Sequence, residues 1–330
     1  MSVDAHVLQL DECTTDCAQL VGGKATGLGA LLRQGLQVPR GFAITTTAYR
    51  EHIAHNRLNA DLERLLANCT TYDAQLRAAE EIRGLFASSL VAPAVEDEVL
   101  RAHTRLSQTN EAPVAVRSSA TAEDLADASF AGQQETYLGV LGAADVLRNV
   151  VRCWSSLFTP QALAYRAHLR IPVTDLAMGV VVQCMVPAEA AGVMLTVDPV
   201  TGDTSTLVIE AAYGLGPAVV NGEVTPDRAC VDKARLEIRS KSIGSKTVAY
   251  RFDGSRQGIR LEDVAHEQQD KPCISDAEFV GLARLGIRME QAMGRAQDVE
   301  WAIGPGANGA REVFLLQARP ETVWSRNPHE

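Results

Sequence analysis

The chain has 330 residues, of which 46% are hydrophobic, so it is long enough to bury a sizeable core and to form about two domains or large subdomains. Its formal charge of −10 and the lack of any apolar run near the roughly 18 residues of a membrane span argue against nucleic-acid and membrane partners. The N-terminus does not resemble a secretory signal and the seven cysteines are scattered, so we expect a cytoplasmic protein with reduced thiols and a small-molecule or protein partner.

The N-terminal half is predicted to be mostly helical. A glycine-bearing segment, residues 21–24, precedes leucines at helical spacing, which indicates a loop that leads into a helix closed by Gly35. A short strand is expected at residues 41–44. Residues 48–107 are rich in Ala, Leu, Arg and Glu with few helix breakers, so they are predicted to be helical.

The segment Gly22-Gly23-Lys24 is a candidate phosphate-binding element. It is not a Walker A loop, because Lys24 is followed by Ala25 instead of Ser or Thr. Consecutive glycines let backbone N–H groups approach a phosphate, the following helix offers its positive end, and Lys24 adds a charge. A tight turn followed by a surface lysine is the alternative.

A strand at residues 114–116 leads into a long polar segment, residues 117–134. Loops of this length without secondary structure are uncommon unless they are functional. Arg117, the serines after it and the glycine-bearing residues 129–133 bring a guanidinium, hydroxyls and flexible backbone to one strand end, as in sites that hold a triphosphate. A capped loop with a surface arginine is the alternative.

The C-terminal half is predicted to be rich in β-strands. Two helices precede it, at residues 143–158 and from Pro160, where Thr159 suits an N-cap. Period-two hydrophobic segments bounded by Gly, Pro or Asp then occur at residues 178–186, 191–197, 205–212, 228–240, 246–252, 298–303 and 313–319. One further helix is expected from Ser275, which forms a capping box with Glu278, to Gly294.

The junction of the two halves is a candidate hinge and adenine site. Gln183, Met185 and Val186 precede Pro187 there. Adenine would lie against Met185 with main-chain groups reading its edge, and Glu189 would accept the ribose hydroxyls. A plain strand that ends in a proline turn is the alternative.

The last two strands flank a glycine-rich turn and are predicted to form a hairpin. Alternation puts Asp298 and Glu300 on one face of the first strand, and Gln317 and Arg319 on one face of the second. Carboxylate and amide oxygens suit Mg²⁺, and an arginine contacts phosphate bidentately. The alternative is the solvated polar face of an ordinary hairpin.

Five motifs occur in a fixed order along the chain: Val21-Gly22-Gly23-Lys24, Val116-Arg117-Ser118-Ser119, Ser129-Phe130-Ala131-Gly132-Gln133, Gly192-Val193-Met194 with Asp198-Pro199, and Gln317-Ala318-Arg319-Pro320-Glu321-Thr322. Together they resemble the N-terminal nucleotide domain shared by phosphoenolpyruvate synthase, pyruvate phosphate dikinase and rifamycin phosphotransferase. The resemblance covers about residues 10–325.

The resemblance implies an α+β, ATP-grasp-like fold in which two subdomains, residues 1–185 and 186–330, enclose a cleft for ATP and Mg²⁺. The catalytic and phosphate-binding residues that it implies are Lys24, Arg117, Asp298, Glu300, Gln317 and Arg319. Glu300 and Gln317 among them would hold the metal. The implied nucleotide-binding residues are Gly132, Gln183, Met185, Val186 and Glu189.

The implied reaction transfers the β-phosphoryl group of ATP to a histidine, with AMP and phosphate as products, for onward transfer to an acceptor such as pyruvate or a phenol. None of the seven histidines of this sequence lies in the family's Thr-x-x-[SC]-His signature. We therefore expect the histidine on a partner subunit, as in phenylphosphate synthase, or on a further domain. A direct small-molecule kinase and a non-catalytic nucleotide-sensing relic are the alternatives.

Overall fold

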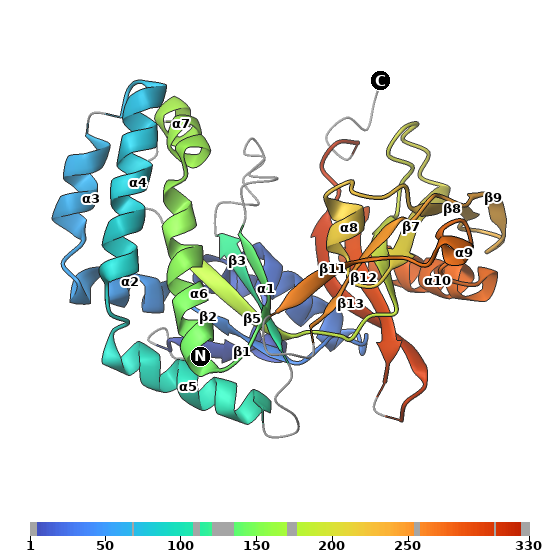
Figure 1. Ribbon diagram of the computed structural model, residues 1–330, viewed down its shortest axis with the longest axis horizontal. Helices are drawn as coiled ribbons and strands as arrows, with labels where there is room; N and C mark the ends of the chain where they lie inside the picture. The colour runs from blue at the N-terminus through green and yellow to red at the C-terminus, as the bar shows by residue number, and fades with distance from the viewer. Residues whose placement is uncertain are drawn as a thin grey trace. The chain divides into compact units, whose positions relative to one another are not determined.

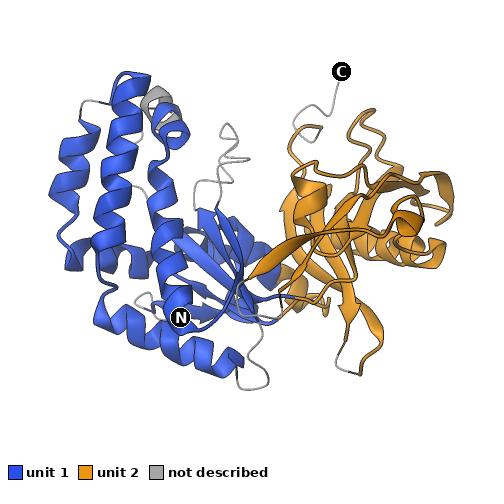
Figure 2. Ribbon diagram, viewed as in Figure 1, with its two compact units in different colours: residues 1–29, 40–185 blue, residues 30–39, 186–330 orange. Residues whose placement is uncertain are grey.

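The computed structural model describes residues 5–67, 69–107, 113–120, 135–169, 177–253, 258–306 and 308–324 (Figure 1). The chain divides into two compact units, residues 1–29 with 40–185 and residues 30–39 with 186–330 (Figure 2). Each unit has its own sheet and helices.

The sheet of the first unit has five strands in the order β1-β2-β5-β3-β4, and all neighbours are antiparallel. The strands are β1 (Val7–Gln9), β2 (Gly41–Ile44), β3 (Val114–Ala120), β4 (Thr136–Val140) and β5 (Met178–Cys184). The helices are α1 (Ala18–Arg33), α2 (Thr46–His55), α3 (Asn59–Leu66), α4 (Tyr72–Ser88), α5 (Pro93–Ser107), α6 (Ala143–Ser155) and α7 (Pro160–Leu169). The predicted helical character of residues 48–107 is confirmed by α2 to α5.

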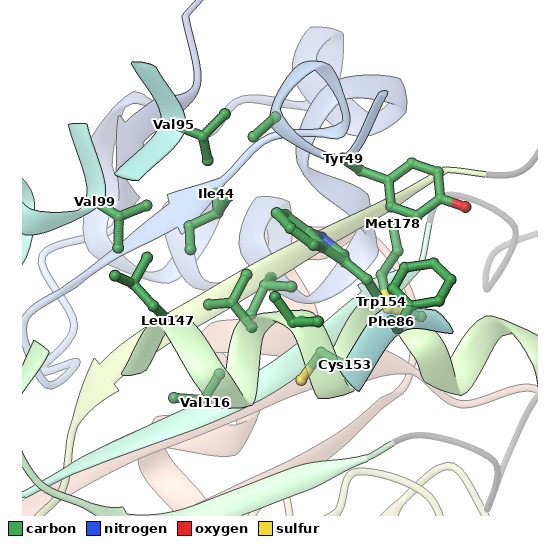
Figure 3. Close-up of a cluster of buried hydrophobic side chains, with 14 of the residues drawn as sticks. Ile44, Tyr49, Phe86, Val95, Val99, Val116, Leu147, Cys153, Trp154 and Met178 are labelled. Carbon is green, nitrogen blue, oxygen red and sulfur yellow. The ribbon is translucent and has the colours of Figure 1, made fainter. Parts of the chain in front are cut away.

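The core of the first unit lies between its helices and its sheet (Figure 3). Trp154 of α6 is fully buried, packs edge-on against Tyr49 at a ring-centroid distance of 6.0 Å and lies 4.9 Å from the ring of His52. The predicted cap of α7 is confirmed, because the Ala162 N–H donates to Thr159 Oγ1 at 3.2 Å.

The prediction that a loop begins at Arg117 is wrong, because residues 117–120 continue strand β3. Every residue of β3 is buried, and its backbone is paired along its length with β5. Pairing with neighbouring strands outweighs the polar composition of this stretch. The rest of the expected loop, residues 121–134, lies outside the described residues.

The second unit is built on a six-stranded antiparallel sheet in the order β13-β12-β6-β7-β8-β9, with a separate β10-β11 hairpin. Its strands are β6 (Ala190–Leu195), β7 (Thr206–Tyr213), β8 (Asp227–Asp232), β9 (Ile238–Ser242), β10 (Val248–Phe252), β11 (Ile259–Asp263), β12 (Gln297–Pro305) and β13 (Arg311–Pro320). Its helices are α8 (Pro217–Val220), α9 (His266–Gln269) and α10 (Asp276–Met293). The strand predicted over residues 228–240 is two strands, because a turn with Leu236 at φ 56° separates β8 from β9.

Helix α10 packs against the large sheet and buries Phe279, Leu282 and Met289. Its predicted ends are confirmed: Ser275 and Glu278 form the capping box, and Gly294 adopts a left-handed conformation at the C-cap. On this face of the sheet, the first hairpin strand buries its alternate residues, including Val299 and Trp301.

Candidate functional site

The two strands of the C-terminal hairpin pair so that the four predicted residues form two cross-strand pairs. Glu300 lies opposite Gln317, and Asp298 lies opposite Arg319. The register shifts immediately after Glu300, since Trp301 pairs with Leu315 and leaves one extra residue on β13. Such bulges bend a strand and re-aim its side chains. The predicted hairpin is therefore present, and its register brings two oxygen-bearing side chains together at Glu300 and Gln317.

The Asp298–Arg319 pair fixes a guanidinium at one end of the hairpin. Both Nε and Nη2 of Arg319 donate to Asp298 Oδ2, at 2.8 and 2.7 Å. The Arg319 side chain is 56% exposed and that of Asp298 is 21% exposed, so the carboxylate holds the arginine from the sheet side while the guanidinium faces solvent. This orientation suits an anion that approaches from outside.

A row of polar side chains continues across the sheet from Glu300. Glu300 pairs with Val193, Val193 pairs with Glu210 and Glu210 pairs with Arg228, so these residues share one face of the sheet. The side chains of Glu210 and Arg228 are about one-third exposed and form a long ion pair of 3.7 Å. Sequence reasoning assigned no role to either residue. Glu210 is the only charged residue of β7, a signal that could have singled it out.

Glu189 lies at the other end of the same strands. Its N–H donates to the carbonyl of Ile303 at 2.9 Å. Asp298 is five residues further along β12, which corresponds to about 17 Å. The Glu189 carboxylate pairs with Arg311, which also binds Glu278 at 3.0 Å. The side chain predicted to read ribose is thus already an ion-pair partner of an exposed arginine.

The predicted adenine segment has two unpaired main-chain groups. Met185 N–H donates to the carbonyl of Pro113 at 3.0 Å, and the carbonyl of Val186 accepts from the N–H of Ala188 at 2.8 Å. Among the described residues, neither the Val186 N–H nor the Met185 carbonyl has a hydrogen-bond partner. One donor next to one acceptor is the pattern that reads the edge of an adenine ring. Gln183 is buried in the central strand β5.

In the first unit, Lys24 lies beside the Arg117 strand. Its Nζ donates to the carbonyl of Ser118 at 2.8 Å, one residue from Arg117. The predicted loop is a kink inside α1, where Gly22 has φ 77°. A Cβ at Gly22 would lie 2.2 Å from the carbonyl oxygen of Ser119, so only glycine lets the helix approach β3 this closely. The structure therefore brings the two predicted phosphate-binding cations of this unit together.

Gly132 lies outside the described residues. A shallow pocket of about 290 Å³ in the second unit, lined by Leu36, Arg288 and Leu315 among others, contains none of the predicted site residues. In the described part of the chain, no cluster of three or more His, Cys, Asp or Glu side chains is arranged to hold a metal ion. A cation at Glu300 and Gln317 would therefore need water and ligand oxygens to complete its shell. No helix among the described residues is long and apolar enough to cross a membrane.

Comparison with known proteins gives a match over nearly the whole chain. Residues 18–330 match the family model described as pyruvate phosphate dikinase, AMP/ATP-binding domain. A probable phosphoenolpyruvate synthase of Staphylothermus marinus is 41% identical, with 97% of this chain and 41% of the relative covered. The phosphoenolpyruvate synthase of Aeropyrum pernix is 39% identical, with 98% and 43% covered.

A rifampicin phosphotransferase of Streptomyces sviceus is 40% identical, with 97% of this chain and 36% of the relative covered. The resemblance read from the sequence motifs is thus confirmed. The chain spans about two fifths of the length of these relatives.

Proposed function

The chain belongs to the family of pyruvate phosphate dikinase AMP/ATP-binding domains, and on that premise we propose that it binds Mg²⁺ and ATP and transfers a phosphoryl group from ATP. The proposed architecture is ATP-grasp-like, with residues 1–185 and 186–330 as its two subdomains. Each contributes one set of polar groups to the same ATP molecule.

The observation that carries the proposal is the Glu300–Gln317 pair beside the Asp298–Arg319 pair. Two oxygen ligands next to a fixed guanidinium suit a magnesium-bound polyphosphate. The order along β12 supports the same pose, since the Val186 and Glu189 end would take adenine and ribose, and the Asp298 end the phosphates. Gln183 and Met185 would line the base, and Gly132 would contact the nucleotide.

The proposed chemistry asks the protein mainly to position groups and to neutralise charge. A histidine nitrogen attacks the β-phosphorus, AMP leaves, and water releases the γ-phosphate, so the β-phosphoryl group remains on the histidine. Lys24, Arg117 and Arg319 would bind the negative oxygens. Mg²⁺, held by Glu300 and Gln317, would supply the charge that bridges them.

The proposed phosphoacceptor is a histidine on a partner subunit or on a further domain, from which the group passes to a final acceptor such as pyruvate or a phenol. Two relatives named phosphoenolpyruvate synthase, each more than twice as long as their matched part, support this order of events. The relative named rifampicin phosphotransferase supports the second candidate, direct transfer to a small molecule.

A product analysis with ATP labelled at the β-phosphorus separates these candidates. The purified chain is expected to bind ATP with Mg²⁺ and to form AMP slowly, and an extract that supplies the histidine protein should accelerate AMP formation. Rapid formation of ADP with a small acceptor and no added protein would favour the direct kinase. Binding of ATP without turnover under any of these conditions would favour the nucleotide-sensing role.

A further inference from the structure

Two segments of the second unit form an uncharged, exposed surface next to the Asp298–Arg319 pair. The first is the turn after β6, where Val200 is 71% exposed. The second is the stretch after β13, where Val323 is 71% exposed and Trp324 is 37% exposed. We call residues 199–201 and 322–324 the apolar patch.

The register of the sheet fixes the position of the apolar patch. Leu195, the last residue of β6, pairs with Asp298, and the turn that contains Val200 follows it. Pro320, the last residue of β13, pairs with Gln297. Both segments therefore leave the sheet at the end that carries the Asp298–Arg319 pair.

The two segments are locked to each other, so the patch is a built surface. Trp324 Nε1 donates to the carbonyl of Pro199 at 3.0 Å. The carboxylate of Glu321, which is only 7% exposed, accepts from the N–H groups of Val323 and Trp324 at 2.5 and 3.1 Å. A preordered apolar surface loses little conformational entropy when a partner covers it.

We propose that the apolar patch docks the protein domain that carries the phosphoacceptor histidine. This inference rests on the proposed function, since a histidine that attacks the β-phosphorus must reach the phosphate end of the hairpin. Three properties favour that occupant. The patch adjoins this end, it is uncharged on a chain of net charge −10, and the matched relatives have more than half of their length outside the region that this chain matches. Exposed Trp and aliphatic side chains around a rigid turn are typical of protein interfaces.

The test measures transfer of label from ATP labelled at the β-phosphorus to protein. The acceptor is an extract of the source organism from which the gene for this chain has been deleted. The double variant Val200→Asn/Val323→Asn, which leaves the charge unchanged, is expected to slow protein labelling at least tenfold without changing the Kd for Mg-ATP. Val220→Asn and Leu90→Asn are matched controls, because these side chains are 58% and 73% exposed elsewhere in the chain, and both should label as fast as the wild type.

Unchanged labelling by the double variant would overturn the docking role and leave the proposed function intact. Weaker ATP binding by the double variant would also overturn it, because the patch would then support the nucleotide site itself. No labelling by the wild-type chain would overturn the proposed function and this inference with it.

A photo-crosslinking residue at position 200 identifies the occupant directly. Crosslinking to the labelled protein from position 200, and not from position 220, is expected. Crosslinking only to a second copy of this chain, or only to its residues 325–330, would overturn the proposed occupant.

Discussion

Lys246 and Asp227 form an ion pair from which solvent is fully excluded, with Lys246 Nζ 2.5 Å from Asp227 Oδ1 and neither side chain exposed. Asp227 also accepts from the N–H groups of Gly244 and Cys273, at 3.1 and 2.7 Å. The pair thus connects the start of β8 to the segments on either side of the β10-β11 hairpin. Neither residue belongs to the candidate site, so the pair provides a test of the fold alone.

Replacing Lys246 by Met should lower the free energy of unfolding by about 3–5 kcal/mol, because it leaves the Asp227 carboxylate buried without its cation. Equilibrium denaturation of the chain measures this change. The double variant Lys246→Met/Asp227→Leu should recover part of the loss, since the unpaired charge is gone. A loss below about 1 kcal/mol in the single variant would mean that water reaches the carboxylate.

Replacing Glu300 by Gln or Gln317 by Ala should reduce turnover by about 100-fold or more while the melting temperature changes little. Both side chains lie on the face of the hairpin opposite the buried Val299 and Trp301. Turnover and thermal unfolding are measured on the same samples. Glu312→Gln, in the same hairpin near its turn, is the matched control and should keep full activity. A collapse of stability in both site variants would reassign the pair as structural.

The Asp298–Arg319 pair predicts graded effects. Arg319→Ala should cost about 100-fold or more in kcat, as expected for loss of a cation aimed at developing charge. Asp298→Asn should cost about tenfold, since it weakens a charge-assisted hydrogen bond by about 1.5 kcal/mol and keeps the guanidinium. Steady-state kinetics of both variants give the order. Equal losses would indicate that Asp298 contacts the reacting groups itself.

The sequence predicted those features that depend on neighbouring residues. Thr159 and Ser275 were identified as helix caps because the capping bond is made within one turn of each. Strands β1 and β4 were missed and β3 was cut short at Arg117, because these strands are defined by pairing with segments far away in the chain.

The same division applies to the candidate site. Alternation alone predicted that Glu300 and Asp298 share a face, but their partners depend on the extra residue in β13, which shifts the register by one. The row from Glu300 to Glu210 and Arg228 needs the order of four strands, which no local pattern contains. Chemistry was therefore readable from residue types, whereas contacts required the sheet.

Gly22 provides a test of the close approach between α1 and β3. Gly22→Ala should destabilise the chain, because φ is 77° and the new Cβ would meet the Ser119 carbonyl oxygen at 2.2 Å. ATP affinity should fall with it, since Lys24 is held by the next carbonyl. Gly84→Ala is the control: its Cβ would meet nothing within 4 Å inside α4, so it should stabilise by about 0.5–1 kcal/mol. Thermal melts and ATP titrations of both variants measure the contrast, and equal behaviour would contradict the steric argument.

His52 gives the first unit an acid-sensitive core. Burial, with a smaller contribution from the nearby charge of His55, lowers the pKa of His52 from 6.5 to about 4. The Ser89 hydroxyl donates to the Phe86 carbonyl at 2.7 Å, so it accepts from His52 Nε2–H at 3.0 Å and the ring is neutral. Protonation would place a charge against the ring of Trp154, 4.9 Å away.

Because the folded-state pKa lies below the unfolded value, the stabilisation by neutral His52 is complete above about pH 6.5. It is lost as the pH falls toward 4, by up to about 3 kcal/mol. Denaturant unfolding at a series of pH values between 7 and 4 measures the loss. His52→Gln, which does not titrate, should be less stable at pH 7 and flatter across this range. An equal slope in the variant and the wild type would assign the acid sensitivity to other groups.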